Sequence, residues 1–322
     1  MRTFLCLALA CSFLPSAQTS LSAASAQGMQ RLRHAFQSNK FVAYTPSEYC
    51  PLAGKITNAT EESIRADLLV LKPNFDVLVT YSSNPAHGLD QVVPLAGELR
   101  MRVVLGIWDV RSVREIETAV TLSRKYSNTV IGVIVGNETQ LRAEKWENLE
   151  AAIKLVRAAL PDVPVSTSEP ITSYGNDDLR EVVDFHAPIC LWIFQGGNRH
   201  DPKAAVAWLK ERITSLREMP GGDKPILIKE HGLPSGPDPF TPELQKEYWQ
   251  IWMKEMPNTE KYTSNVFESF DLPWKPKTNP SELGASEAFW GAWASQRRPK
   301  PIVAVLPKAN ESQSSGVKKP SP

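Results

Sequence analysis

The stretch Val130-Ile131-Gly132-Val133-Ile134-Val135-Gly136-Asn137-Glu138 indicates the fold class of this chain. Its apolar residues are continuous rather than alternating, which is typical of a parallel strand that is buried on both faces. Similar runs rich in Val and Ile recur along the chain. From these runs we predict eight strands, at residues 41–44, 77–81, 103–107, 130–135, 163–168, 189–194, 225–229 and 266–270.

Amphipathic helices are predicted in the gaps between these strands. Within residues 146–160, and again within 206–216, apolar residues recur at steps of three and four, which places them on one helical face. The Asp-Pro of residues 201–202 and the Thr-Pro of residues 241–242 each offer an N-cap side chain followed by proline at the first helical position. The Asn and Glu at the ends of residues 58–61 resemble a capping box.

Strands that alternate with helices, with no linker between them, predict a single (β/α)8 TIM barrel. A doubly wound α/β sheet is the alternative fold. That fold favours a glycine-rich turn after its first strand, whereas residues 45–48 after the first predicted strand contain no glycine. The sequence therefore favours the barrel.

The first 26 residues are predicted to be a secretory signal peptide. One cation precedes an apolar stretch over residues 4–14, and the Ala-Ser-Ala of residues 24–26 fits a cleavage site. The stretch is shorter than the roughly 18 residues that a membrane-spanning helix needs. Lipid attachment at Cys11 is the alternative, and it would leave a still shorter apolar segment. We expect a mature protein that begins at Gln27, is secreted or periplasmic, and has no integral membrane segment.

The composition of the rest of the chain separates a folded domain from a polar tail and argues against a nucleic-acid partner. Residues 306–322 are polar apart from a few positions and hold three prolines, which predicts a disordered tail and leaves residues 27–305 as one folded domain. The chain carries 36 Lys and Arg against 35 Asp and Glu, with no long basic run, so nucleic acid is not an expected partner.

Cysteine and histidine are too sparse to suggest a disulfide framework or a metal centre. After the signal peptide only Cys50 and Cys190 remain, and we expect both to be unpaired, with a bridge between them as the alternative. The five histidines are scattered, and the first strand ends in Tyr-Thr-Pro rather than in His-x-His. No metal and no cofactor are expected.

Two glutamates follow directly on predicted strands. Glu138 follows the fourth strand, and Glu230 follows the seventh, within Glu230-His231-Gly232-Leu233-Pro234-Ser235. In a TIM barrel both would face the same mouth, where active sites lie. A pair of carboxyl groups placed there is the apparatus for acid-assisted displacement at the anomeric carbon of a sugar. Loop salt bridges are the plainer interpretation for either glutamate alone.

Over residues 41–300 the sequence resembles glycoside hydrolase family 17, especially its bacterial β-1,3-glucanase-like and β-glucan transglycosylase branch. The resemblance rests on a small set of motifs: Phe41-Val42-Ala43-Tyr44-Thr45-Pro46, Gly136-Asn137-Glu138, Ser166-Thr167-Ser168-Glu169-Pro170, the Glu230 motif, Phe267-Glu268-Ser269-Phe270-Asp271-Leu272-Pro273-Trp274-Lys275, Trp290-Gly291 and Arg298-Pro299-Lys300.

This resemblance implies a retaining mechanism in the domain at residues 27–305. Glu138 would be the general acid/base and Glu230 the nucleophile, which would form a covalent glycosyl-enzyme. Asn137 would bind the sugar 2-hydroxyl. The substrate would be an oligo- or polysaccharide, most simply a β-1,3-glucan, and the product would form by hydrolysis or by transfer to a second sugar. We expect the protein to be a monomer.

Further substrate contacts are expected at the strand ends, because sugar rings pack on aromatic side chains while their hydroxyls need polar partners. The candidates are Tyr44, Tyr81, Trp108, Asp109, Glu169, Trp192, Phe194, Trp274 and Lys275, with Glu268 and Asp271 as possible supports. The chain departs from the family pattern at Ile189, Ile193 and Leu233, where a His, a Tyr and a Trp are usual. A noncatalytic carbohydrate-binding barrel is therefore the alternative function.

The two carboxyl groups also carry a geometric and an electrostatic expectation. In a retaining enzyme they should lie about 5–5.5 Å apart. Like charges at that separation do not ionise together easily, so we expect the pKa of Glu138 to be raised.

Overall fold

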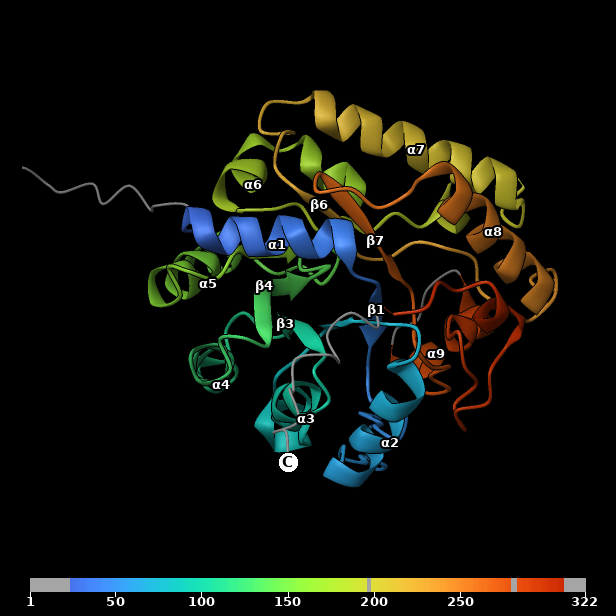
Figure 1. Ribbon diagram of the computed structural model, residues 1–322, viewed down its shortest axis with the longest axis horizontal. Helices are drawn as coiled ribbons and strands as arrows, with labels where there is room; N and C mark the ends of the chain where they lie inside the picture. The colour runs from blue at the N-terminus through green and yellow to red at the C-terminus, as the bar shows by residue number, and fades with distance from the viewer. Residues whose placement is uncertain (1–23, 196–197, 279–282, 310–322) are drawn as a thin grey trace, which may run out of the picture.

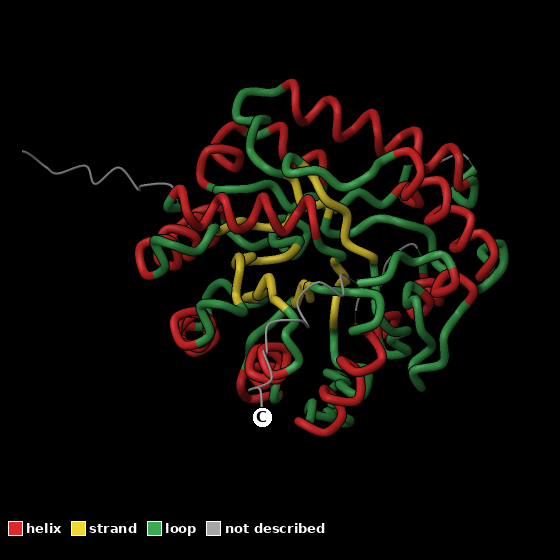
Figure 2. Tube along the Cα trace, viewed as in Figure 1, coloured by secondary structure: helices red, strands yellow, loops and turns green. Residues whose placement is uncertain are grey.

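A curled, seven-stranded parallel sheet forms the centre of the computed structural model, which describes residues 24–195, 198–278 and 283–309. Neighbouring strands follow the order β5-β4-β3-β2-β1-β7-β6, so consecutive strands lie side by side and β1 pairs with β7. Figure 2 shows the strands at the centre, with helices around them. The strands are β1 Phe41–Tyr44, β2 Val77–Thr80, β3 Arg102–Ile107, β4 Val130–Asn137, β5 Val165–Ser168, β6 Ile226–Ile228 and β7 Tyr262–Val266. The fold is therefore α/β and TIM-barrel-like.

The sixth predicted strand, at residues 189–194, is not formed, and this part of the sequence-based prediction is wrong. Residues 184–190 instead run between β5 and β6 without regular strand geometry. His186 N donates to Pro225 O at 2.8 Å on the β6 side, and Ile189 N donates to Glu169 O at 3.0 Å on the β5 side. Pro188 has no N–H to donate, which interrupts a continuous ladder. Residues Trp192–Phe194 form the short 3₁₀ helix η4.

The last predicted strand, at residues 266–270, is displaced toward the N-terminus. The strand that forms is β7, and polar side chains within it hid it from a hydropathy pattern. Thr263 and Asn265 are fully buried in it, and Asn265 Nδ2 donates to Lys229 O at 2.8 Å. The Nδ2 group of this buried amide thus has a backbone partner, which helps a polar residue to occupy the strand interior.

Helices cover the outside of the sheet (Figure 1). The α-helices are α1 Ala26–Ser38, α2 Glu61–Leu71, α3 Val92–Glu98, α4 Val113–Lys125, α5 Trp146–Ala159, α6 Asp177–Val182, α7 Pro202–Glu218, α8 Pro242–Glu255 and α9 Lys275–Thr278. Shorter 3₁₀ helices are η1 Pro85–His87, η2 Leu89–Gln91, η3 Ile171–Gly175, η5 Gly284–Phe289 and η6 Pro301–Ala304. The helices predicted from periodicity are confirmed as α5 and α7.

Two of the three predicted helix starts are confirmed. Asp201 and Thr241 accept hydrogen bonds from the first backbone N–H groups of α7 and α8, each with proline following. The expected Asn58–Glu61 box is wrong. Thr60 caps α2, because Thr60 and Ser63 exchange side-chain and backbone hydrogen bonds.

Helix α1 closes the sheet at the end away from the carboxyl ends of the strands. Leu32 and Phe36 of α1 pack with Phe41, Phe185 and the other buried side chains that fill the inside of the curled sheet. In Figure 1 this helix crosses in front of the strands. Phe36 contacts both Phe41 and Phe185 edge to face, at centroid distances of 5.7 and 6.3 Å. This interior is thus filled by side chains rather than open.

The C-terminal boundary of the fold differs from the expected one. Residues 306–309, which were expected to belong to the tail, lie against the fold: Leu306 is buried, and Ala309 N donates to Pro73 O at 3.1 Å. Residues 310–322 lie outside the described part, as does the expected signal peptide up to residue 23.

Cys50 and Cys190 are both free thiols. In the described ranges we find no helix with the length and apolar character to span a membrane.

Candidate active site

Glu138 follows the last residue of β4, where the backbone turns sharply. Gly136 has φ 79°, and Glu138 itself has φ 50°, a left-handed conformation that is uncommon for residues other than glycine. A Cβ at Gly136 would lie 2.5 Å from Thr139 Cγ2, so glycine is needed for this turn. Glu138 N donates to Ser168 O of β5 at 2.8 Å, which anchors the turn to the neighbouring strand.

Glu230 lies two residues beyond β6, at the same end of the sheet. Its side chain is 7% exposed, and its Oε1 lies 3.7 Å from the Nζ of Lys229. Because all strand pairings are parallel, the carboxyl ends of β4 and β6 open onto one mouth. The structure therefore brings the two sequence-predicted glutamates to the same end of the sheet.

The electrostatics of Glu138 match those expected of an acid. Burial, and then the negative charge of Glu230, raise the pKa of Glu138 to about 7. The ammonium of Lys229 opposes this rise, and the carboxyl groups of Glu287 and Glu169 add to it. A carboxyl group with this pKa holds its proton over much of the range below neutral pH.

Asn137 and Tyr81 meet at the side chain of Lys229. Lys229 Nζ donates a hydrogen bond to Asn137 Oδ1 and lies 3.8 Å from the centroid of the Tyr81 ring. Asn137 is 4% exposed, and Tyr81 follows directly on β2. Burial, followed by Glu230 and Glu268, raises the pKa of the Tyr81 phenol well above its usual value, so the hydroxyl stays protonated.

Glu169 is fully buried at the end of β5, and its carboxylate is occupied by protein groups. Its Oε1 accepts hydrogen bonds from Thr139 N at 2.9 Å and from Thr139 Oγ1 at 2.5 Å. Gln140 N donates to the other oxygen at 3.3 Å. Glu169 therefore supports the loop after Glu138 and presents no free carboxylate to the mouth.

Glu268, Trp274 and Lys275 come together beyond β7. Lys275 Nζ lies 2.6 Å from Glu268 Oε1 and 4.7 Å from the centroid of the Phe267 ring. Glu268 is fully buried, and burial raises its pKa to about 7 against the opposing effect of Lys275. Trp274 packs edge to face on Tyr49, with a centroid distance of 6.1 Å.

Asp271, the other expected support, is also engaged. Its Oδ1 accepts hydrogen bonds from Lys300 Nζ at 2.6 Å and from Gly291 N at 3.0 Å. Lys300 Nζ also donates to Ser235 Oγ at 2.7 Å, which ties the segment after β7 to the Glu230 motif.

Tyr44 is placed by the structure in the core rather than in the mouth. The ring is 1% exposed, and its hydroxyl donates to Asp67 Oδ2 of α2 at 3.0 Å. The expected substrate contact of Tyr44 is therefore corrected to a core hydrogen bond.

Trp108 and Asp109 follow β3 and are exposed. The guanidinium of Arg142 lies 4.3 Å from the centroid of the Trp108 ring, and Arg142 also donates to Trp108 O at 3.1 Å. Asp109 Oδ1 accepts from Arg111 N at 2.9 Å and so closes a local turn. One face of this rim tryptophan is therefore covered by a cation.

Trp192 and Phe194 lie on η4, beyond the irregular segment. Trp192 is half-buried, packs on Trp208 of α7 with a centroid distance of 6.0 Å, and donates through its indole N–H to Asn198 O at 3.2 Å. Phe194 is 42% exposed. Of the two, Phe194 offers the freer aromatic surface.

The positions that depart from the family pattern are buried. Ile189, Ile193 and Leu233 are at most 4% exposed, and Ile193 and Leu233 pack into the main core. His231 of the Glu230 motif is also fully buried, and its Nδ1 and the Tyr248 hydroxyl of α8 lie 2.8 Å apart. Burial lowers the pKa of His231 to about 3, so it stays neutral. This motif therefore packs β6 onto α8 as well as placing Glu230.

Lys229 and Arg142 were missed by sequence reasoning. Nothing in the sequence distinguishes either from a surface cation, although Lys229 directly precedes a candidate nucleophile.

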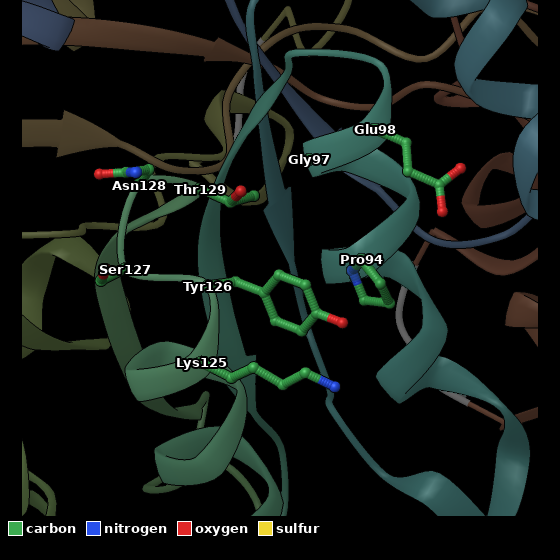
Figure 3. Close-up of a pocket in the computed structure, with 8 residues that line it drawn as sticks. All are labelled: Pro94, Gly97, Glu98, Lys125, Tyr126, Ser127, Asn128 and Thr129. Atoms are coloured by element: carbon green, nitrogen blue, oxygen red, sulfur yellow. The ribbon is translucent and has the colours of Figure 1, made fainter.

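A recess between α3 and α4 lies apart from the candidate active site, because Thr129 on its wall precedes β4, at the strand end opposite Glu138 (Figure 3). Its lining residues are Pro94, Gly97, Glu98, Lys125, Tyr126, Ser127, Asn128 and Thr129.

A TIM-barrel-like fold with two glutamates at the carboxyl ends of its strands, one of them with a raised pKa, is typical of glycoside hydrolases. The chain belongs to the BtgE/BtgC glycoside hydrolase domain family, whose model matches residues 42–291. The expected relationship to glycoside hydrolase family 17 is confirmed by this match and by the neighbours described next.

Solved structures and one curated relative agree with this family. A glycoside hydrolase family 17 β-1,3-glucanosyltransferase from Rhizomucor miehei superposes with a TM-score of 0.65 at 22% identity, covering 81% of this chain and 95% of that one. An endo-laminarinase from Formosa Hel1_33_131 gives a TM-score of 0.60 at 18% identity, covering 83% and 86%. A glucan 1,3-β-glucosidase from Arthroderma benhamiae is 25% identical over 251 residues, which is 73% of this chain and 82% of the relative.

Proposed function

We propose that this chain is a retaining, β-glucan-active glycoside hydrolase or transglycosylase that acts on β-1,3-glucan through a covalent glycosyl-enzyme. The observation that carries the proposal is the placement of Glu138 and Glu230 at the carboxyl ends of two parallel strands, and burial and the charge of Glu230 also raise the pKa of Glu138 to about 7. Two carboxyl groups that influence each other in this way can divide the work between an acid and a nucleophile.

In the first half-reaction, an oxygen of Glu230 attacks the anomeric carbon. The bond from that carbon to the departing sugar oxygen breaks, and Glu138 donates its proton to this oxygen. In the second half-reaction, Glu138 takes a proton from water or from a sugar hydroxyl, whose oxygen displaces Glu230 from the anomeric carbon. This mechanism requires the carboxyl groups to lie about 5–5.5 Å apart, a separation that stays a prediction.

Asn137 is proposed to bind the 2-hydroxyl of the sugar that reacts. It ends β4 beside Glu138, and its side-chain oxygen is already taken by Lys229. Its amide N–H groups are then the part that would meet a hydroxyl. Hydrogen bonds to this hydroxyl strengthen as the oxocarbenium-like transition state develops.

A glucan is the proposed substrate because exposed aromatic surface follows several strand ends at this mouth. Trp108 and Phe194 are 39% and 42% exposed, and Phe289 is 38% exposed beside Gly236. Such rings suit the C–H faces of glucose units. The relatives described above, a β-1,3-glucanosyltransferase and a glucan 1,3-β-glucosidase, support the β-1,3 linkage.

The test is to incubate the purified protein with β-1,3-gluco-oligosaccharides of defined length and to size the products and determine their linkages. Shorter products indicate hydrolysis, and products longer than the substrate indicate transfer. Binding of the oligosaccharides without any product would contradict the proposal and support the noncatalytic carbohydrate-binding barrel instead.

We also propose that an eighth segment closes the barrel. Residues 184–190, which hydrogen-bond to both β5 and β6, would take the position of the eighth strand in a (β/α)8 barrel.

We propose further that the protein is exported and that residues 1–26 are removed as a signal peptide on secretion. This cleavage would also remove Ser25, whose hydroxyl accepts a hydrogen bond from Gly28 N at the start of α1. Mass spectrometry of the mature N-terminus tests the cleavage position, and a protein that retains Met1 would contradict it.

A further inference from the structure

Lys229 is a buried cation that contacts both the candidate nucleophile and the candidate sugar-binding amide. Its side chain is 1% exposed, and its Nζ lies 3.7 Å from Glu230 Oε1 while donating to Asn137 Oδ1. We propose that Lys229 is a positioning residue that pairs with the Glu230 carboxylate and turns the Asn137 amide so that its N–H groups face the sugar. This inference rests on the proposed retaining function.

The orientation of Asn137 follows from the chemistry of an ammonium group. Lysine carries three donors and no acceptor, so its only possible partner on an amide is the oxygen. The Nδ2 group of Asn137 is thereby left for other partners. Asn137 O is separately occupied, because Arg142 Nε donates to it at 3.1 Å. Both ends of this residue are therefore fixed by cations, and its amide has one orientation that satisfies Lys229.

Lys229 also forms a buried ion pair with Glu230. Its Nζ lies 3.7 Å from Glu230 Oε1, and both side chains are shielded from water. The charged groups that act on Lys229 are Glu230, Glu138 and Glu169, which favour its charge, and Lys275, which opposes it. Burial lowers the pKa of Lys229 to about 8, so the ammonium form still prevails at neutral pH.

A matched control lies at the other end of the same strand. Lys224 precedes β6 as Lys229 follows it, and it too is partly withdrawn from water. Its Nζ donates to the backbone carbonyls of Arg180 at 2.5 Å and Val183 at 2.7 Å, far from the mouth. Replacing Lys224 removes an equivalent side chain from β6 without touching either glutamate.

The experiment compares wild type, Lys229→Met, Lys229→Arg and Lys224→Met. The value of kcat/KM is measured on an aryl β-glucoside with a good leaving group and on its 2-deoxy analogue. In Lys229→Met we expect discrimination against the 2-deoxy substrate to fall severalfold, because the Asn137 amide loses the donor that fixes its orientation. Lys229→Arg should keep the wild-type discrimination, and Lys224→Met should leave it unchanged.

An equal loss of rate on both substrates, with unchanged discrimination, would reduce Lys229 to a packing role and overturn the inference. A second measurement works without turnover. The side-chain amides of ¹⁵N-labelled asparagine are observed by NMR, with Asn137→Asp used to assign the Asn137 signal. If wild type turns over no glucoside, the proposed function fails, yet an Asn137 amide signal that is displaced in Lys229→Met and not in Lys224→Met still supports the orientation by Lys229, and an undisplaced one overturns it. Lys229→Gln replaces the Met variant if near-ultraviolet circular dichroism shows that the latter is unfolded.

Discussion

Glu169 holds Thr139, the residue after Glu138, by two hydrogen bonds: its Oε1 accepts from Thr139 N at 2.9 Å and from Thr139 Oγ1 at 2.5 Å. The two residues come from the ends of β5 and β4. The loop that carries the candidate acid is therefore fixed by a buried carboxylate on the neighbouring strand rather than by its own residues.

Replacing Glu169 with Gln should loosen this loop. The amide keeps the size of the carboxylate but loses charge and one acceptor, and a hydrogen bond to a charged group contributes about 1.5–3 kcal/mol. We expect kcat/KM on a gluco-oligosaccharide to fall by about tenfold or more as Glu138 becomes less well placed. Thr139→Val, which removes only the hydroxyl donor, serves as the milder control. Unchanged kinetics in both variants would show that the loop does not depend on Glu169.

The activity of the wild-type protein should fall as pH rises through about 7. The pKa of Glu138 is raised to about 7, so its carboxyl is protonated below this value and ionised above it. Only the protonated form can donate to the leaving oxygen. We expect a basic limb near pH 7 in kcat/KM on an oligosaccharide substrate.

Glu138→Gln should remove this limb and most of the oligosaccharide activity. An aryl glycoside with a good leaving group needs little proton donation, so its first step should survive in the variant. Glu144→Gln, in the same loop but hydrogen-bonded to Asn148, is the matched control and should keep the limb. An equal loss on both substrates in a folded Glu138→Gln protein would remove Glu138 from the acid role.

Glu230→Ala should abolish formation of the covalent glycosyl-enzyme. A 2-fluoro glycoside should label the wild-type protein at Glu230, as detected by mass spectrometry of its peptides, and should leave the variant unlabelled. Added azide should restore turnover of an activated substrate with inversion, because a small anion can occupy the space of the missing carboxylate. Labelling of the variant to the same extent as wild type would place the nucleophile elsewhere.

Arg297→Ala should destabilise the fold. Arg297 Nε donates to Asp67 Oδ1 at 2.6 Å, and Asp67 is fully buried beneath the loop after β1. Leaving a buried acceptor with fewer partners costs about 1–3 kcal/mol, which urea unfolding can measure. Arg65→Ala on α2 is the control, because its ion pairs with Glu61 and Glu98 lie on the surface. Equal midpoints for both variants would contradict the expectation.

The sequence predicted the strands that are largely apolar, because burial on both faces leaves a continuous hydrophobic run. It also predicted β5, although three of the four residues of that strand are Ser or Thr. It misplaced β7, whose buried Thr263 and Asn265 look like loop residues until the backbone carbonyl that holds Asn265 is known. It also predicted a regular strand at residues 189–194, directly after Pro188, where the chain instead leads into the 3₁₀ helix η4.

The two glutamates were predictable because each directly follows an apolar strand. The supporting residues were not, since their roles depend on partners distant in the chain. Tyr44 looks like a cleft aromatic, but its hydroxyl binds Asp67 on α2. Lys229 looks like an ordinary strand-end cation, but it lies against Asn137 and Tyr81 from two other strand ends.

The left-handed backbone at Glu138, with φ 50°, implies a conflict between durability and activity at this single position. A residue with a side chain in this conformation costs about 1–3 kcal/mol, and glycine avoids that cost. Glu138 also keeps a carboxyl group in surroundings that disfavour its ionised form. A chain with glycine at position 138 should therefore melt at a higher temperature than the natural one while having lost its acid. Selection for heat resistance alone would favour the disabled protein, so any programme that evolves this enzyme for stability has to screen for turnover in the same round.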